Sequence, residues 1–210
     1  MTVGPPRGSL ASIAGDHLPW LDEVDAHVEI DLVSARLARE LRDSARQVIG
    51  LLPASPTTPI QALARQLAVA FSRLTRKTVV ILDPEATSVA KGSASSAFHE
   101  RSDHDASHAL FALHRIDPLI VHSAPDHAAP PGAKAELLKL MLLHVEDSVA
   151  YGMIFVDMSG LVWPGEMLAG QARLDGVIVC GHLGKTTEPE IVATSRRVPP
   201  ELALGVLLVD

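Results

Sequence analysis

The segment that most constrains the fold lies between residues 48 and 74, where an apolar run, a polar loop and an amphipathic stretch follow one another. Val48 and Ile49 begin a run that is typical of a buried strand. The loop then reads PASPTTPIQ, and the stretch after it repeats apolar residues at helical spacing: Leu63, Leu67, Ala70, Phe71 and Leu74. A strand, a tight loop and a helix in this order predict a βα unit of an α/β sheet.

The loop lies where a phosphate-binding loop would lie, between a strand and a helix, but it lacks the residues that bind phosphate. Such a loop reads G-x-x-x-x-G-K-[ST], because backbone N–H groups must close around phosphates while lysine neutralises them and a hydroxyl meets magnesium. Here Thr57, Thr58 and Pro59 replace the glycine-rich turn, Ile60 stands at the lysine position and Gln61 at the hydroxyl position. Proline donates no N–H, threonine resists positive φ and isoleucine carries no charge. We therefore expect no phosphate cradle of the usual kind.

The hydroxyls of this loop have two interpretations. Ser55, Thr57 and Thr58 could bind an anion, but these residue types are equally suited to turns and helix caps. We favour capping, with Pro59 as the first residue of the helix that follows.

The remaining runs predict a parallel sheet with helices on both faces, a three-layer α/β fold. Together with the strand, loop and helix described above, this arrangement is similar to the P-loop NTPase fold. The strands are expected at 78–83, 118–124, 153–157, 176–181 and 204–210, where the chain is almost entirely apolar. Helices are expected at 31–47, with Asp31 or Ser34 as its cap, and at 133–147, while 84–107 suits a long loop or a weak helix.

Composition limits the class of protein. A chain of 210 residues fits one domain, so we expect a flexible arm at 1–30 and a single domain at 31–210. The formal charge of −7 disfavours a general nucleic-acid surface. No segment reaches the roughly 18 apolar residues of a membrane span, and the amino-terminal sequence lacks the apolar core of a signal peptide, which favours a cytoplasmic protein without direct membrane insertion. Cys180 is the only cysteine and ends an apolar strand, so it should lie in the core.

Taken in order, these segments resemble the deviant-Walker P-loop ATPases, and among them the cytoplasmic domain of the bacterial tyrosine kinases of capsule and exopolysaccharide synthesis. The resemblance extends from about residue 31 to residue 210. It is carried by VIGLLPASPTTPIQA, VVILDPE, YGMIFVDMSG, LDGVIVCGHLGKTT and LGVLLVD, which arrive in the order and at the separations of the family's strands.

The resemblance implies roles for three acidic positions. Asp83 stands where the family has the first aspartate of its second acidic motif, Glu85 replaces the second, and Asp157 stands at the Walker B aspartate. In a working enzyme such carboxylates hold magnesium and orient the attacking hydroxyl. Because the loop lysine and hydroxyl are missing, we expect these carboxylates to be remnants, with no catalytic residue, no metal and no cofactor.

Two further differences from the family also argue against a working kinase site. The family has an asparagine after its last core strand that contacts adenine, whereas the matching stretch here is Leu208, Val209 and Asp210. The kinases also phosphorylate a tyrosine-rich tail, and this sequence holds one tyrosine, Tyr151. Neither adenine recognition nor autophosphorylation is therefore expected.

Three other patterns carry alternative interpretations. Six histidines fall in one third of the chain, and His104 and His108 are spaced as zinc ligands on a helix, but a solvated surface is favoured; the six are His99, His104, His108, His114, His122 and His127. A second short segment resembles half of a phosphate-binding loop, namely Lys185, Thr186 and Thr187. We favour a structural loop there. Acidic residues around Trp20 form an arm that either binds a basic partner or stays solvated.

These observations lead to two hypotheses. The first is a non-catalytic, tyrosine-kinase-like regulator or scaffold of bacterial exopolysaccharide or capsule assembly or export. By the resemblance, it would contact a membrane-bound polysaccharide chain-length regulator or export component, be recruited to the inner membrane by that partner, and form homo-oligomers. The second is a divergent ATPase or switch of the partition and positioning type, which would bind ATP and magnesium through Asp83, Asp157 and a lysine from a remote loop such as Lys185.

Overall fold

The structure is a computed structural model, and it describes residues 10–11, 26–42, 47–85, 111–125, 133–161, 167, 169, 171 and 173–209. Its centre is an eight-stranded sheet with the order β1-β8-β7-β2-β6-β3-β5-β4. The strands are β1 (Leu10–Ala11), β2 (Val48–Pro53), β3 (Val79–Leu82), β4 (Phe111–Asp117), β5 (Ile120–Pro125), β6 (Met153–Asp157), β7 (Gly176–His182) and β8 (Ala203–Val209).

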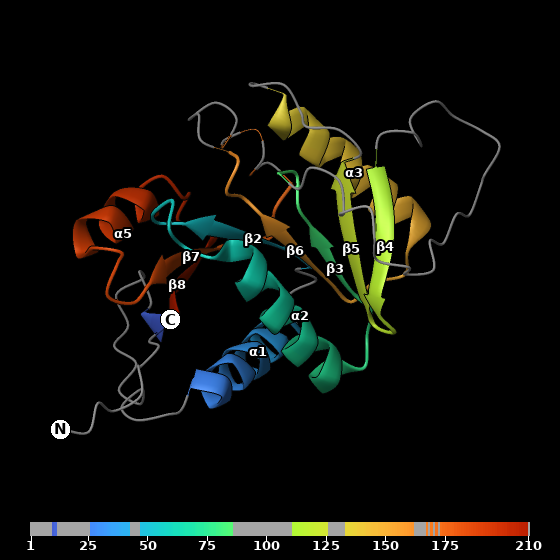
Figure 1. The fold of residues 1–210 in the computed structure, drawn as a ribbon, viewed down its shortest axis with the longest axis horizontal. Coiled ribbons are helices and arrows are strands. Elements are labelled where there is room, and N and C mark those ends of the chain that lie inside the picture. Colours follow the sequence, from blue (N-terminus) through green and yellow to red (C-terminus); the bar gives the residue numbers. More distant parts are fainter. Residues whose placement is uncertain are drawn as a thin grey trace.

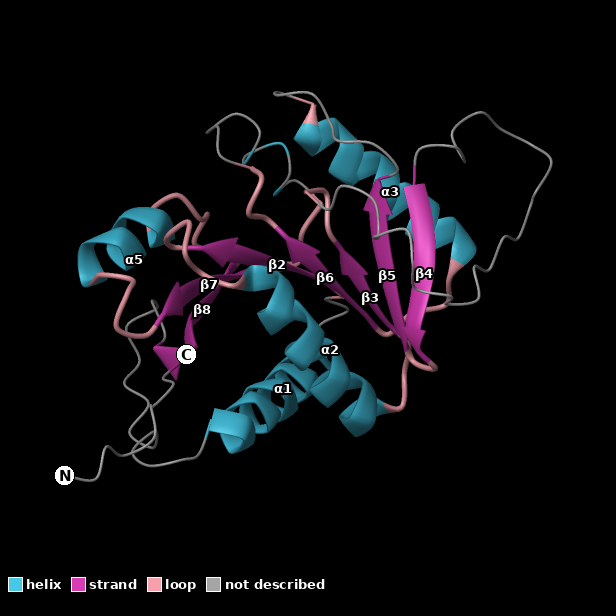
Figure 2. Ribbon diagram, viewed as in Figure 1, coloured by secondary structure: helices cyan, strands magenta, loops and turns pink. Residues whose placement is uncertain are grey.

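Six of these strands, from β8 to β5, are parallel to one another, whereas β1 and β4 pair antiparallel at the two edges. The long helices are α1 (Ala26–Arg42), α2 (Ile60–Thr75) and α3 (Lys134–Ser148), and a shorter helix, α5 (Glu188–Ser195), follows β7. Figure 1 shows the strands fanning across the middle of the molecule, with β2 and β6 at its centre. Figure 2 shows the same arrangement by type of element.

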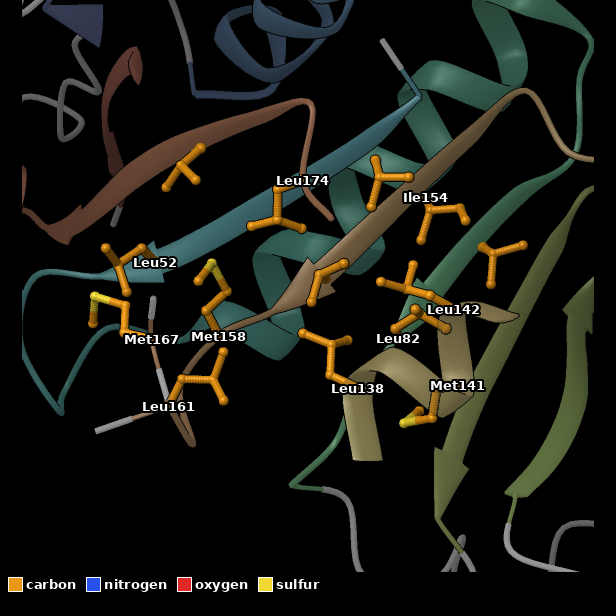
Figure 3. Packing of buried hydrophobic residues seen from close by; sticks show 14 of the residues in the cluster. Leu52, Leu82, Leu138, Met141, Leu142, Ile154, Met158, Leu161, Met167 and Leu174 are labelled. Atoms are coloured by element: carbon orange, nitrogen blue, oxygen red, sulfur yellow. The ribbon is translucent and has the colours of Figure 1, made fainter. Parts of the chain in front are cut away.

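Two apolar cores hold the three layers together. On one face, α1 and α2 cover the sheet, and Phe155 of β6 meets Phe71 of α2 edge to face with 6.2 Å between ring centroids. On the other face, α3 packs Leu138, Met141 and Leu142 against the sheet, as Figure 3 shows. Strands buried on both faces require uninterrupted apolar runs, which accounts for the sequence of the central strands.

The structure confirms the predicted three-layer α/β fold and each strand predicted from an apolar run. The predicted start of the first helix is wrong, because α1 already begins at Ala26 and Ser34 lies buried within it. Neither Asp31 nor Ser34 is therefore its cap. The edge strands β1 and β4 and the helix α5 were not predicted, and the residues around Trp20 lie outside the described ones.

Candidate functional site

The candidate site lies at the carboxyl edge of the parallel strands, where open α/β sheets bind ligands. Asp157 is the last residue of β6, and Asp83 directly follows β3, which is the neighbour of β6 in the sheet. The helix α2 begins at the same edge, after the loop that follows β2 (Figure 1). The topology thus brings the two predicted carboxylates and the start of α2 together.

Asp83 is tied to the helix and to its own loop. Its exposed fraction is 3%, its Oδ2 accepts a hydrogen bond from Gln61 Nε2 of α2 at 3.0 Å, and its Oδ1 accepts the backbone N–H of Glu85 at 3.0 Å. His122 of β5 also faces it, with Nε2 3.7 Å from Asp83 Oδ2. The Gln61 amide and the Asp83 carboxylate are thus hydrogen-bonded to each other directly.

Asp157 is a buried carboxylate with one local partner. Its exposed fraction is 4%, and its Oδ1 accepts the backbone N–H of Ser159 at 2.8 Å. Burial raises the pKa of Asp157 above its ordinary value, and the nearby charge of Asp83 raises it further, against the lowering effects of the Ser159 hydrogen bonds and of His122. The site therefore disfavours a second negative charge beside the first.

Glu85, the third predicted acidic residue, has a cationic partner from α3. It forms an ion pair with Lys134, the first residue of α3. A side-chain atom added to Gly160, in the loop after β6, would collide with the Glu85 carboxylate, so glycine allows this close approach. The acidic residue that replaces the family's second aspartate therefore links the ends of β3 and β6 to α3.

The polar groups of the loop between β2 and α2 form hydrogen bonds with one another and with β7. The hydroxyls of Ser55 and Thr57 are 2.8 Å apart, Thr58 N–H donates to the Ser55 carbonyl at 3.1 Å, and the Thr58 hydroxyl donates to the Cys180 carbonyl of β7 at 3.4 Å. The N-cap of α2 is Pro59, which has no side-chain capping bond, and the helix begins at Ile60. The prediction that Pro59 is the first helical residue is thus off by one position. The favoured capping role of the loop hydroxyls is also wrong, because α2 has no side-chain capping bond and these hydroxyls bond to one another and to β7.

Ile60 and Gln61 occupy the lysine and hydroxyl positions of a P-loop, and both make contacts within the fold. The side chain of Ile60 has an exposed fraction of 2% and belongs to the core beneath α2. A lysine at this position in a P-loop extends toward the phosphates, whereas isoleucine adds to the apolar packing. Gln61 is exposed except for its bond to Asp83.

The loop of Lys185, Thr186 and Thr187 is a structural turn, as the sequence favoured. Thr186 Oγ1 accepts the backbone N–H of His182 at 2.7 Å, and Gly184 takes a left-handed φ of 71°. Thr187 caps α5 through a capping box in which its N–H and its hydroxyl both reach Glu190 Oε2, at 2.7 and 2.8 Å. The hydrogen bonds from Thr187 lower the pKa of Glu190.

A metal site fits the described residues poorly. Across the described ranges, no group of three histidine, cysteine or acidic side chains could hold a metal ion. His99, His104, His108 and His127 lie outside these ranges. Of the six clustered histidines, His114 and His122 are described, as register partners on β4 and β5.

The residues around the site do not fit a magnesium-bound nucleotide either. Magnesium in a P-loop enzyme is held by the loop hydroxyl and the Walker B aspartate. Here the hydroxyl position is Gln61, whose amide donates to Asp83 instead, and the Walker B position is the buried Asp157. Phosphates need free backbone N–H groups and a lysine, whereas this loop holds Pro59 and the buried Ile60.

Two residues of the site were missed by sequence reasoning. His122 was assigned to a solvated surface with five other histidines, yet its exposed fraction is 4%. Its position inside the apolar run PLIVHSA was the available signal, since a residue within a buried strand is buried too. Lys134 carries no such signal, because its partner Glu85 is far away in the sequence.

Among the described helices, none combines the length and the apolar character that a membrane crossing needs. Cys180 is fully buried, as expected.

Comparisons with known proteins agree on the fold. No protein-family model matches the sequence, and no curated protein is similar to it in sequence. Among solved structures, the chimerical protein CapA2B2 is 14% identical with a TM-score of 0.59, covering 86% of this chain and 83% of its own. The BceF tyrosine kinase domain is 16% identical with a TM-score of 0.58, covering 87% and 76%. The kinase domain of the Escherichia coli tyrosine kinase ETK is 12% identical with a TM-score of 0.62, covering 87% and 74%. The chain therefore shares its α/β fold with the BceF and ETK tyrosine kinase domains.

Proposed function

We propose that this protein is a non-catalytic, tyrosine-kinase-like regulator or scaffold of bacterial exopolysaccharide or capsule assembly or export, and that it acts by protein contact. The fold shared with bacterial tyrosine kinase domains supports the class of protein. The proposed partner is a membrane-bound chain-length regulator or export component, which would recruit the protein to the inner membrane, and the proposed assembly includes homo-oligomers.

One observation carries the non-catalytic part of the proposal. The hydrogen bond of 3.0 Å from Gln61 Nε2 to Asp83 Oδ2 links the position of the loop hydroxyl, which holds magnesium in a P-loop enzyme, to the position of the first aspartate of the second acidic motif. Gln61 offers no hydroxyl for the ion, and its amide is used within the fold. The bond also fixes the first turn of α2 to the end of β3.

The loop supports the same proposal independently. Its hydroxyls are used for contacts within the loop and with β7, and Ile60 is part of the core. Opening this loop around a phosphate would break those contacts and expose apolar surface, which costs free energy that a single phosphate contact does not restore. The loop therefore suits a stable scaffold better than a nucleotide site.

Calorimetric titration with ATP and ADP, with and without magnesium, tests the proposal. We expect no binding at millimolar nucleotide in the natural protein and none in Asp157→Ala. The matched variant restores the loop through Thr57→Gly, Pro59→Gly, Ile60→Lys and Gln61→Ser. If the fold alone can support nucleotide binding, this variant should gain measurable affinity.

Saturable binding by the natural protein that Asp157→Ala abolishes would contradict the proposal and favour the divergent ATPase. The partner part is tested separately, by asking whether the tagged protein co-purifies with a membrane-bound chain-length regulator or export component from bacterial cells. Recovery of that membrane protein is expected, and a protein that instead localises to a cell pole without it would point to the positioning class.

A further inference from the structure

The basic residues of α2 and of the turn after it lie on an exposed face of the molecule. From residue 47 to residue 82 the sequence contains four basic residues and no acidic one, although the whole chain holds 25 acidic and 18 basic residues. The four are all exposed: Arg65, Arg73, Arg76 and Lys77. Leu74 lies among the last three and is 51% exposed. These five residues form a positive surface on a negative molecule, and we call it the basic face of α2.

The fold does not neutralise the charges of this face. Around α3, which covers the opposite face of the sheet (Figure 1), cations have acidic partners, in the pairs Lys134–Glu85, Lys139–Glu136 and Arg173–Glu146. The neighbouring helix α1 carries three acidic residues and three arginines, of which Arg36 pairs with Glu40. Within the described part of the chain, no ion pair joins the basic face of α2 to an acidic side chain. Its cations are therefore available to a partner.

Arg76 holds its charge at a position that suits glycine better. It is the C-cap of α2, where its backbone takes a left-handed φ of 57° and its N–H donates to the Ser72 carbonyl at 2.8 Å. Glycine takes this conformation without steric cost and is the usual residue there. The helix dipole accounts for a cation in the last turn, which Arg73 supplies, but not for this choice of residue. A side chain kept in a costly backbone conformation indicates a use beyond the fold.

An anionic lipid surface is the partner whose chemistry fits this face. A helix face with arginine, lysine and an exposed apolar side chain is typical of proteins that lie in the headgroup layer. Each basic residue close to such a surface strengthens binding by about fivefold. The negative charge on the rest of the molecule has little effect there, because salt screens charges that are more than about 10 Å away. The same negative charge disfavours a nucleic acid, which would contact a wider surface.

We propose that the basic face of α2 contacts the anionic lipid surface of a membrane. The inference deepens the proposed recruitment to the inner membrane and rests on it, because four cations bind weakly and a membrane-bound partner would hold the protein in place. The face also sets an orientation. Since α2 ends where β3 begins, the amino edge of the sheet turns toward the lipid, and the carboxyl edge with Asp83 and Asp157 turns away from it.

Co-sedimentation of the full chain with vesicles tests the proposal. Vesicles of phosphatidylcholine are compared with vesicles that also contain phosphatidylglycerol, and we expect binding to the anionic vesicles only, which weakens as salt is added. Changing Arg73, Arg76 and Lys77 together to Gln should weaken this binding by at least about tenfold. Arg73→Gln alone should weaken it by about fivefold. Its matched control is Lys139→Gln, an exposed position of α3 on the other face, which should change binding by less than about twofold.

Arg76→Gly separates lipid binding from folding. Because glycine suits the left-handed C-cap, this variant should be at least as stable as the natural protein in urea, yet bind the anionic vesicles about fivefold less tightly. The proposal is overturned if the natural protein does not bind anionic vesicles at low salt, binds neutral vesicles equally well, or keeps its binding in the triple variant. Binding to soluble polyglutamate as tight as to the vesicles would also overturn it and point to an acidic protein. The vesicles contain no protein, so failure here is distinct from failure to co-purify with a membrane partner.

Discussion

At the scale of single residues, the site shows how a few side chains can change the chemistry of an edge while the sheet remains. The side chain of Gln61 is two atoms longer than that of a serine, and it reaches Asp83 directly, at 3.0 Å. Ile60 turns a cationic position into a core position, with an exposed fraction of 2%. Gln61 gives Asp83 a hydrogen-bond partner within the protein, and Ile60 replaces a charge with apolar packing.

Asp157→Asn should stabilise the protein near neutral pH. Burial raises the pKa of Asp157, so the folded state holds a proton that the unfolded state has already lost. Stability therefore falls as pH rises from the ordinary aspartate range through the raised value, and asparagine removes this loss. We expect an increase in the free energy of unfolding on the order of 1 kcal/mol above that window and little difference below it.

Urea unfolding at several pH values measures this effect, with Asp117→Asn as the control. Asp117 is exposed and accepts the N–H of the residue two positions later, Leu119, as Asp157 does with Ser159. The control should show no comparable gain. A loss of stability in Asp157→Asn that is equal at every pH would show that the carboxylate is favourable in the fold.

At the scale of elements, side-chain hydrogen bonds hold both edges of the sheet, the amino edge where β2 begins and the carboxyl edge where β7 ends. The start of β2 is fixed by Asp175, whose Oδ2 accepts the backbone N–H groups of Gln47 and Val48 at 2.6 and 2.8 Å. The loop after β7 is held by Thr186 and passes directly into the cap of α5. The resemblance of this loop to a phosphate-binding sequence reflects turn and cap chemistry.

Thr187→Ala should therefore cost about 1 kcal/mol of stability, because it removes the hydroxyl of the capping box. Thr187→Ser keeps the hydroxyl and should cost much less. Thermal unfolding followed by circular dichroism compares the two variants. Equal stability of the alanine and serine variants would contradict a capping role.

At the scale of the whole molecule, the sheet is a scaffold buried from both faces. Phe155 lies in the central strand β6, has no exposed surface and packs on Phe71 of α2. The opposite core is built by α3 against the same strands, so β6 joins both layers (Figure 3). The loss of nucleotide binding that we propose for the edge therefore does not require any change in this core.

Phe155→Ala should destabilise the protein by about 3–5 kcal/mol, since it opens a cavity between the sheet and α2. Leu74→Ala is the comparison, because Leu74 lies on the same helix with an exposed fraction of 51%, and it should change stability by less than about 0.5 kcal/mol. Urea unfolding measures both. A similar cost for the two variants would mean that the α2 face is not the core described above.

Local patterns explain which parts of this fold could be predicted. The strands β3, β6 and β7 are uninterrupted apolar runs, because they are buried on both faces. The edge strand β4 mixes apolar and charged residues in FALHRID and lacks such a run, so it was missed. The start of α1 was placed too late because the residues before Asp31 show no clear helical repeat of apolar side chains.

The sequence by itself determined the order of the central strands and the long helices, and the absence of lysine, glycine and a magnesium-binding hydroxyl from the corresponding positions of the loop, since both are properties of neighbouring residues. Only the tertiary structure decided what the remaining polar groups do. Asp83, Gln61 and His122 come from β3, α2 and β5, and they meet because parallel strands in register end at one edge of the sheet. Contacts of this kind depend on the register and packing of distant segments, which a local pattern does not encode.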